Sequence, residues 1–351
     1  MPSPQGQFGR AALGSWVIIA AVVIVGAGAF IFTAGWVSPQ RVTPNKLLAA
    51  LAPPGGPALG RRRNHVKGAC FTGAFEANGA GTALSTAPMF ARGQYPVVGR
   101  FNVGTSDANA ADGTVRVRGM GLQITAPGGQ VWRSAMIDPP FFPVATPRAF
   151  YGLLLATGSK SPDEMKTFAA AHPEFATFGA WAKSAPWTGS YAEERYNSLN
   201  SFVFTNGSGQ RSVVRWSLLP AASPVPVAPD VLAKRAPDFL EQEIAQRVQG
   251  GPLRWTMIVT VAAPGDPTAD PSKAWPQDRR VVDVGTLVVQ QVQPDRDGPC
   301  RDINYDPTVL PAGVATSDDP FPAARSSAYR VSYDRRTAEE KDYPRTAPEA
   351  R

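Results

Sequence analysis

The sequence contains little of what most metal and redox sites are built from. Among its 351 residues there are two histidines, His65 and His172, and two cysteines, Cys70 and Cys300. So few histidines exclude a metal site with several imidazole ligands. No Cys-x-x-Cys occurs, and this excludes iron–sulfur ligation and a dithiol redox motif. Two classes of site that depend on clustered ligands are thereby removed.

Charged residues are also few, at 18%, and the net charge of +7 is dispersed along the chain. The tightest basic cluster is Arg61-Arg62-Arg63, and no block of five like charges occurs. Because no basic stripe, zinc-finger spacing or known nucleic-acid motif is present, we expect no nucleic-acid partner. No internal repeat of solenoid or propeller length is present either. The 43% hydrophobic content provides for a sizeable core.

A long apolar run without charge occupies residues 11–37. A helix of about 20 apolar residues crosses a bilayer, so the run predicts an uncleaved transmembrane signal anchor. Residues 1–10 would form a short cytoplasmic tail. The alternative is a cleaved signal peptide, whose apolar core is shorter, at about 7–15 residues. The anchor interpretation places the protein in a bacterial inner membrane, with its body in the periplasm.

The rest of the chain is expected to hold a linker over residues 38–60, one domain over 61–337 and a flexible tail over 338–351. Within the domain, strand-like segments stand on both sides of a helical block. Strands grouped apart from helices indicate an α+β fold with an antiparallel sheet. Closing eight such strands into a barrel would remove exposed edges.

The helical block carries recognisable start signals. Thr146 precedes Pro147, which places a capping hydroxyl before a proline at the first helical position. Ser161 stands three residues before Glu164, the spacing of a capping box. A third helix is expected around residues 174–184, and an amphipathic helix over 238–248.

One segment near the C-terminus combines a cation and a phenol. Arg325 and Tyr329 are four residues apart, a spacing that places both on one face of a helix. A guanidinium beside a phenol favours the phenolate. The best-known use of a phenolate on a rigid helix is as an axial ligand of haem iron. The plainer interpretation is an ordinary surface pair of arginine and tyrosine.

Several spaced motifs, taken together, resemble the haem catalase family. Arg325-x-x-x-Tyr329, following Asp306-Pro307, is similar to the family's proximal haem-ligand segment. Residues 61–76, which include Arg62-x-x-His65-x-Lys-Gly, are similar to its distal segment. Strands over 97–102 and 114–124 and the segment 138–142 also resemble family segments. The resemblance covers residues 61–336 in the same order throughout.

The resemblance implies a catalase-like fold: a closed antiparallel eight-stranded β-barrel with peripheral helices and a proximal haem-ligand helix. It implies haem b as the cofactor and Tyr329 as the axial ligand of its iron. Arg325 would stabilise the phenolate, and His65 would act as general base and then general acid on the peroxide. Three further arginines match positions that hold the haem propionates: Arg62, Arg100 and Arg336.

Three positions depart from the family pattern. Met136 stands in place of a distal asparagine, Asn102 in place of a distal serine, and Phe150 is one residue away from a phenylalanine that stacks near the haem. These departures, and the short chain, resemble the small catalase-related peroxidases. The predicted function is therefore haem-dependent reduction of hydrogen peroxide or organic hydroperoxides by a small organic reductant, with weak catalase activity at most.

Two other functions stay open from the sequence. One is different hydroperoxide chemistry on the same haem fold, such as rearrangement of a lipid hydroperoxide. The other is a non-enzymatic barrel that binds an apolar ligand. The oligomeric state is also open, a homo-oligomer included. Cys70 and Cys300 form either a disulfide, as an oxidising compartment favours, or two buried thiols.

Overall fold

The computed structural model of the protein describes residues 5–33, 41–159 and 161–346. The chain divides into two units, Met1–Thr43 and Pro44–Arg351. Helix α1 (Gln5–Thr33) belongs to the first unit. The strands and the other described helices belong to the second unit.

The prediction of a transmembrane anchor over residues 11–37, and with it a periplasmic body tethered to an inner membrane, is wrong. Crossing a bilayer takes a helix of about 20 predominantly apolar residues. Within the described ranges, no helix combines the required length with the required apolar character. Residues 34–37 of the predicted anchor lie outside the described part of the chain.

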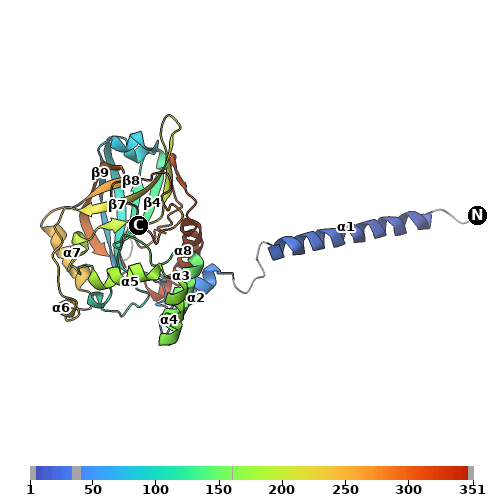
Figure 1. The fold of residues 1–351 in the computed structure, drawn as a ribbon, viewed down its shortest axis with the longest axis horizontal. Helices are drawn as coiled ribbons and strands as arrows, with labels where there is room; N and C mark the ends of the chain where they lie inside the picture. Colours follow the sequence, from blue (N-terminus) through green and yellow to red (C-terminus); the bar gives the residue numbers. More distant parts are fainter. Residues whose placement is uncertain (1–4, 34–40, 160, 347–351) are drawn as a thin grey trace, which may run out of the picture. The chain divides into compact units, whose positions relative to one another are not determined.

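The strands of the second unit close into a barrel (Figure 1). Eight antiparallel strands form the ring in the order β7-β5-β4-β3-β2-β1-β9-β8, and β8 pairs back to β7. Strands β6 and β10 extend the sheet beside β7. The predicted α+β fold with a closed eight-stranded barrel is thus confirmed. The strands are β1 (Gly68–Ala77), β2 (Gly93–Val103), β3 (Arg118–Thr125), β4 (Val131–Ile137), β5 (Tyr196–Asn197), β6 (Phe202–Thr205), β7 (Arg211–Pro220), β8 (Leu253–Val261), β9 (Val281–Pro294) and β10 (Val314–Thr316).

Large side chains fill the barrel interior. Strand β4 alternates buried and half-buried positions, because successive side chains of a strand point to opposite faces. Trp132 of β4 packs edge-on against Trp216 of β7, with ring centroids 4.9 Å apart. Phe101 of β2 stacks on Tyr191 at 5.3 Å. The barrel is therefore a packed core, and ligands must bind outside it.

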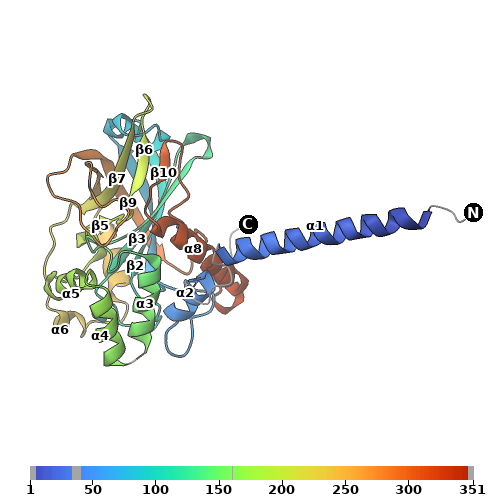
Figure 2. The same cartoon turned by 45° about the vertical axis from the view of Figure 1, so that its right-hand side comes forward.

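Helices gather beside one end of the barrel (Figure 2). Thr146 accepts a hydrogen bond from Ala149 N–H and caps α3 as predicted, whereas Ser161 precedes α4 without a side-chain capping bond. Helix α2 lies within the expected linker and packs against α3 and α8. The helices of the second unit are α2 (Pro44–Leu51), α3 (Pro147–Gly158), α4 (Pro162–Ala171), α5 (Phe175–Ser184), α6 (Pro229–Leu232), α7 (Phe239–Gln249) and α8 (Phe321–Ala338).

The segment after α8 is bonded to the start of the domain. Glu339 accepts hydrogen bonds from the Arg63 guanidinium at 2.5 Å and from Gly60 N–H at 3.0 Å. Gly60 has a left-handed φ of 69°, and a Cβ there would lie 2.7 Å from Tyr343 Cβ. A glycine is therefore needed where the two ends of the domain meet. The predicted flexible tail, 338–351, includes these bonded residues, and its last part, 347–351, lies outside the described residues.

The two cysteines form a disulfide. Cys70 of β1 is joined to Cys300 in the loop after β9, across a sequence separation of 230 residues. Both are fully buried. The bond cross-links the first barrel strand to a segment that also carries part of the candidate site described below.

We expect the disulfide to stabilise the fold, because a cross-link between distant residues reduces the conformational freedom of the unfolded chain. Replacing both cysteines by alanine should lower the free energy of unfolding by about 2–4 kcal/mol. Denaturant titration with and without a reductant measures this. The reductant should destabilise the wild type and have no effect on the double variant; a wild type that is equally stable in both conditions would contradict the expectation.

Candidate functional site

A cavity of about 670 Å³ lies between the barrel wall and the helices. Strands β2, β3 and β4 form one side, and α2, α3 and α8 contribute to the other. The residues that precede β1, Arg62 to His65, also line it. Its volume is within the usual range of small-molecule sites. All six residues predicted to form the site lie on this one cavity: Arg62, His65, Arg100, Arg325, Tyr329 and Arg336.

Helix α8 presents its arginine and tyrosine to the cavity as the spacing predicts. Arg325 Nη2 donates a hydrogen bond to Tyr329 Oη at 2.8 Å. The helix begins where Asp319 Oδ1 accepts the N–H of Phe321 at 2.8 Å, a bond that satisfies one of the free donors of the first turn. The charged guanidinium is thus held against the phenol oxygen by the geometry of a single helix.

Two residues that the sequence motifs did not reveal hold Arg325 in place. Arg325 Nη1 donates to Asn200 Oδ1 at 2.7 Å, and Asn200 Nδ2 donates to Asp319 Oδ2 at 3.0 Å. Arg325 also donates to the carbonyl of Ala135 in β4 at 3.0 Å. Asn200 comes from the segment before β6, so no local spacing links it to α8. A chain of hydrogen bonds therefore links Asp319 through Asn200 and Arg325 to the phenol oxygen of Tyr329.

His65 is held in an unusual backbone conformation. Its φ of 54° is left-handed, which is uncommon for a residue with a side chain. Its N–H donates to Asn64 Oδ1 at 2.9 Å. His65 Nδ1 and Asn102 Oδ1 are both buried and have no hydrogen-bond partner among the described residues. Buried polar atoms are normally hydrogen-bonded, so two such atoms without a partner on one cavity are consistent with a bound molecule that supplies the missing bonds.

Burial keeps the imidazole of His65 neutral. Loss of hydration, together with the nearby charge of Arg100, lowers its pKa from 6.5 to about 4. A ring with this pKa is unprotonated at neutral pH, and so it is able to accept a proton.

Arg62 and Arg336 bind backbone carbonyl groups of the loop that carries Cys300. Arg62 donates to the carbonyls of Cys300 at 2.9 Å and Ile303 at 3.0 Å. Arg336 donates to Ile303 at 3.1 Å and to the carbonyl of Arg301. Arg62 Nε is buried without a partner, and burial lowers the pKa of this guanidinium to about 9. Neither group forms an ion pair with a carboxylate among the described residues.

Arg100 lies on the same cavity but its surroundings differ. Its Nε and Nη2 form a bidentate pair with Asp295, at 2.8 and 3.1 Å. Burial would raise the pKa of Asp295, yet Arg100, with Arg62 and Arg336 behind it, brings it below its usual range. Among the described residues, Asp295 is thus the carboxylate that forms an ion pair within this group of three buried guanidiniums, and sequence reasoning did not find it.

The positions that depart from the family pattern also lie at this site. Met136, Asn102 and Phe150 all line the cavity. Met136 is buried and packs with the barrel core, so its thioether replaces an amide at the wall. Phe150 packs against Phe142, with ring centroids 5.1 Å apart. Apolar groups thus occupy much of the wall.

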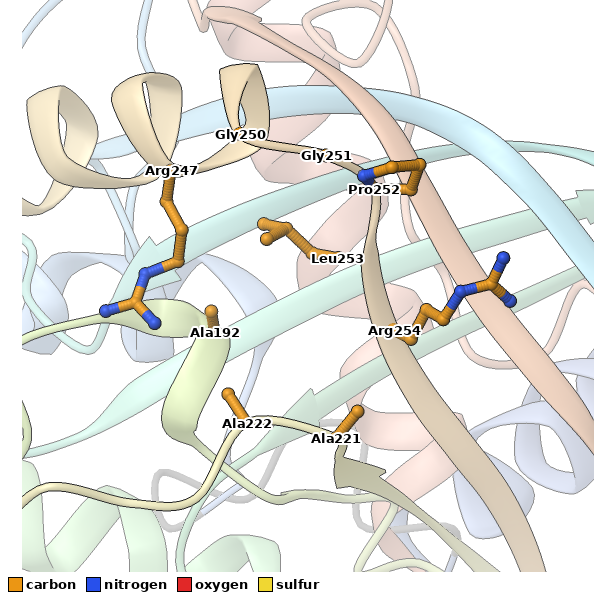
Figure 3. A pocket seen from close by; sticks show the side chains of 9 residues that line it. All are labelled: Ala192, Ala221, Ala222, Arg247, Gly250, Gly251, Pro252, Leu253 and Arg254. Atoms are coloured by element: carbon orange, nitrogen blue, oxygen red, sulfur yellow. The ribbon is translucent and has the colours of Figure 1, made fainter.

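A second cavity, of about 420 Å³, lies where α7 ends and β8 begins (Figure 3). Arg247 and Arg254 flank it, but both are engaged in ion pairs. Arg247 binds Glu193 and Glu243, and Arg254 binds Glu76. None of the predicted site residues lines this cavity, so it is not the candidate site.

The lowered pKa of His65 has a measurable consequence in the haem-free protein. One of the two histidine Hε1 resonances should titrate with a midpoint at about 4, and it should be missing from His65→Gln. Because the folded pKa lies below the unfolded value, protonation favours the unfolded chain. His65 therefore lowers stability increasingly as the pH falls from 6.5 towards 4. A midpoint near 6.5 in a two-dimensional NMR titration would contradict the buried, uncharged state.

Comparisons with known proteins agree with this geometry. A family model described as catalase matches residues 58–344. A catalase-related peroxidase of Synechococcus elongatus is 35% identical over 328 residues, which is 92% of this chain and 96% of the relative. A catalase-related peroxidase of Mycolicibacterium paratuberculosis is 32% identical over 303 residues, or 84% and 95%.

Solved structures show the same fold. A bacterial catalase superposes with a TM-score of 0.70 at 20% identity, over 83% of this chain and 60% of that one. A fungal catalase gives 0.70 at 18%, over 79% and 59%. The chain therefore spans about three-fifths of the length of these two catalases. With a family match over most of the domain and the same closed barrel, the chain belongs to the catalase family.

Proposed function

We propose that this chain is a haem-dependent peroxidase that reduces hydrogen peroxide or organic hydroperoxides with electrons from a small organic donor. Membership of the catalase family supports an oxidoreductase that acts on peroxide. The name of its relatives, catalase-related peroxidase, supports the choice of peroxidase. The observation that carries the proposal is a cavity that joins a neutral buried imidazole and a guanidinium-bound phenol.

The charges of the cavity fit haem b. Its lining includes arginines but no aspartate, glutamate or lysine among the described residues. Arg63 is paired with Glu339 and Arg100 with Asp295, which leaves three guanidiniums without a carboxylate. Haem b would bring two propionates, which would neutralise two of these three guanidiniums, and the phenolate of Tyr329 would offset the single positive charge of a ferric porphyrin. The added anions would thus reduce the unpaired positive charge, which is unfavourable when it is buried. The three are Arg62, Arg325 and Arg336.

In this proposal each residue has one role. Tyr329 would bind the haem iron through its phenolate oxygen, and Arg325 would stabilise that phenolate form. Arg62 and Arg336 hold the propionates, for which a guanidinium offers two parallel donors. Arg100 is not included in this group, because it is already paired with Asp295 and each of its three side-chain nitrogens is already bonded within the protein.

When bound, the haem iron supplies the redox chemistry that cleaves the O–O bond. His65 accepts the proton of the hydroperoxide O–H group. It then gives this proton to the other peroxide oxygen, which departs as water or alcohol when the O–O bond breaks. A pKa of about 4 leaves the imidazole free to accept that proton at neutral pH. In balance, two electrons and two protons convert one hydrogen peroxide into two waters, or one organic hydroperoxide into one alcohol and one water. The organic donor supplies the electrons.

The presence of Met136 on the cavity that His65 lines supports reduction by a donor over dismutation of peroxide. Dismutation needs a second peroxide molecule to be oriented as a reductant. A thioether at Met136 is a weak acceptor and donates no hydrogen bond, so it orients peroxide poorly. The alternative of an apolar-ligand barrel is not favoured, because Trp132, Trp216 and Trp255 fill the barrel interior.

Replacing the proposed axial ligand tests the cofactor assignment. We expect the wild type, reconstituted with haem, to show a high-spin tyrosinate spectrum that Tyr329→Phe abolishes. Tyr333→Phe, one helical turn further along the same cavity wall, is the matched control and should keep the spectrum. Absorption and electron paramagnetic resonance spectra report this. A colourless wild type after reconstitution would refute the haem proposal outright.

Replacing the proposed base tests the reaction. His65→Ala should bind haem normally but lose about 10²–10⁴-fold in peroxide cleavage, the usual contribution of general acid–base catalysis. His172→Ala, outside the cavity, is the control. Steady-state assays with a phenolic donor would follow donor oxidation and oxygen release together. Oxygen release that exceeds donor oxidation in the wild type would show that dismutation dominates.

A further inference from the structure

We propose that Arg100 and Asp295 act as a positioning pair for the backbone of His65, and that Arg100 does not bind the cofactor. The inference rests on the proposed function for the role of His65. It also corrects the sequence-based expectation that Arg100 holds a haem propionate. A side chain that acts through another residue is a positioning residue, and the contacts of Arg100 all point to that role.

The first observation is that each of the three side-chain nitrogens of Arg100 is hydrogen-bonded inside the protein, so that four bonds use four of its five N–H groups. Nε and Nη2 contact the two oxygens of Asp295 at 2.8 and 3.1 Å. Nη1 donates to the carbonyl oxygen of His65 at 2.8 Å, and Nη2 also lies 3.3 Å from the carbonyl of Val66. A guanidinium fork bound in this way has little capacity left for a propionate.

The second observation is the conformation that this pair holds. A left-handed φ at a residue with a side chain is strained, and it persists only where the surroundings enforce it. The two peptide groups that flank His65 are both fixed. Asn64 Oδ1 accepts the His65 N–H, and Arg100 Nη1 binds the His65 carbonyl. The direction of the imidazole therefore depends on Arg100.

The third observation is that the strand is shaped to admit the guanidinium. A Cβ on Gly68 would lie 3.0 Å from Arg100 Cζ and 2.0 Å from the carbonyl oxygen of Phe101. Glycine is required there mainly by the Phe101 carbonyl of the paired strand, and the missing Cβ also leaves room beside the arginine, which is 1% exposed. The close approach of β1 to the guanidinium thus belongs to the same arrangement.

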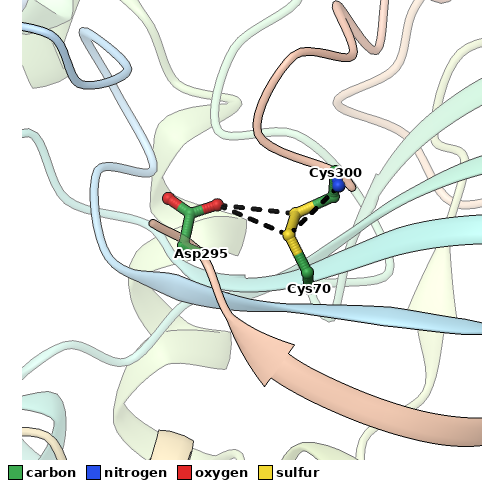
Figure 4. Close-up of side chains that lie close together, drawn as sticks. All are labelled: Cys70, Asp295 and Cys300. Carbon is green, nitrogen blue, oxygen red and sulfur yellow. Dashed lines mark hydrogen bonds between the residues drawn. A yellow bond between two sulfur atoms is a disulfide. The ribbon is translucent and has the colours of Figure 1, made fainter. Parts of the chain in front are cut away.

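The fourth observation is that Asp295 lies beside the disulfide (Figure 4). Its Oδ1 lies 3.5 Å from Cys300 Sγ and 4.0 Å from Cys70 Sγ. The sulfurs are bonded to each other, so this group does not offer thiolates to a metal. The carboxylate has a defined position at the end of β9, and through Arg100 it fixes the backbone of His65.

The test compares variants of Asp295 with a matched pair elsewhere. Asp295→Asn removes the charge of the pair, and Asp295→Glu keeps it. Asp266→Asn is the control, because Asp266 forms the same bidentate contact with Arg279, at 2.7 and 2.8 Å, away from the cavity. Arg100→Lys keeps a cation beside Asp295 but cannot bind both backbone carbonyls. Each protein is assayed haem-loaded and haem-free.

We expect Asp295→Asn and Arg100→Lys to lower kcat for peroxide by about 10–100-fold. A displacement of a catalytic group by about 1 Å reduces the rate by about this factor. The rate of haem dissociation should change by less than about twofold, because neither residue holds a propionate in the proposal. Asp295→Glu should recover most of the activity. In the haem-free protein, the Hε1 resonance of His65 should shift in Asp295→Asn and stay unchanged in Asp266→Asn.

Two results would overturn the inference. One is that Arg100→Lys loses haem faster than the wild type while its haem-loaded fraction has a normal kcat. This result would show that Arg100 binds a haem propionate. The other is an unmoved His65 resonance in Asp295→Asn. The second readout needs no cofactor, so it still decides the positioning role if the wild type binds no haem and the proposed function fails.

Discussion

The site depends on buried positive charge that the protein itself does not fully neutralise. Arg62, Arg100 and Arg336 come together beside one carboxylate, Asp295. Isolated charges are very unfavourable in a protein interior unless they are paired or hydrogen-bonded. The fold provides part of the answer by directing the carbonyls of residues 300–303 at Arg62 and Arg336. In the proposed function, an anionic ligand neutralises the remaining positive charge. The need to bind these guanidiniums brings long-range contacts together on the loop of residues 300–303.

That loop is where the distant parts of the chain are joined. The disulfide connects it to β1, Arg62 reaches it from the segment before β1, and Arg336 reaches it from α8. The segment after α8 then binds back to Arg63 and Gly60. Closure of the barrel places these segments within reach of one another. The two walls of the cavity are consequently held by the same small region, although they are far apart in the sequence.

The sequence predicted those parts of the site that local spacing encodes. Arg325 and Tyr329 are related by one helical turn, and His65 stands in a contiguous motif, so both could be found without a structure. Asn200 and Asp295 could not, because each comes from a distant segment and reaches the site only through the fold. Asp319 immediately precedes α8, but its bond to Arg325 runs through Asn200, so its role could not be predicted either. Arg100 was found as a position, but its partner was not, so its contacts with Asp295 and with the His65 backbone could not be anticipated.

Elsewhere the outcome followed the same rule. The closed barrel was predictable because alternating strands stand on both sides of a helical block and the motifs keep their order. The pairing of Cys70 with Cys300 stayed undecided, since geometry across 230 residues is not written in composition. Helix α2 was missed because a helix of eight residues is too short to be stable alone and depends on its packing against α3 and α8. The anchor over 11–37 was wrong, because apolar composition alone was taken as evidence of a membrane span.

Helix α8 carries Arg325, Tyr329 and Arg336 as one rigid body, and this restricts how the gene can change. Each added or deleted residue rotates everything beyond it by about 100° around the helix axis. An insertion between Tyr329 and Arg336 would carry the second guanidinium away from the cavity while leaving the phenol in place. The outward-facing residues of this segment are free to vary in kind but not in number, so we expect length changes to accumulate in the surface turns instead.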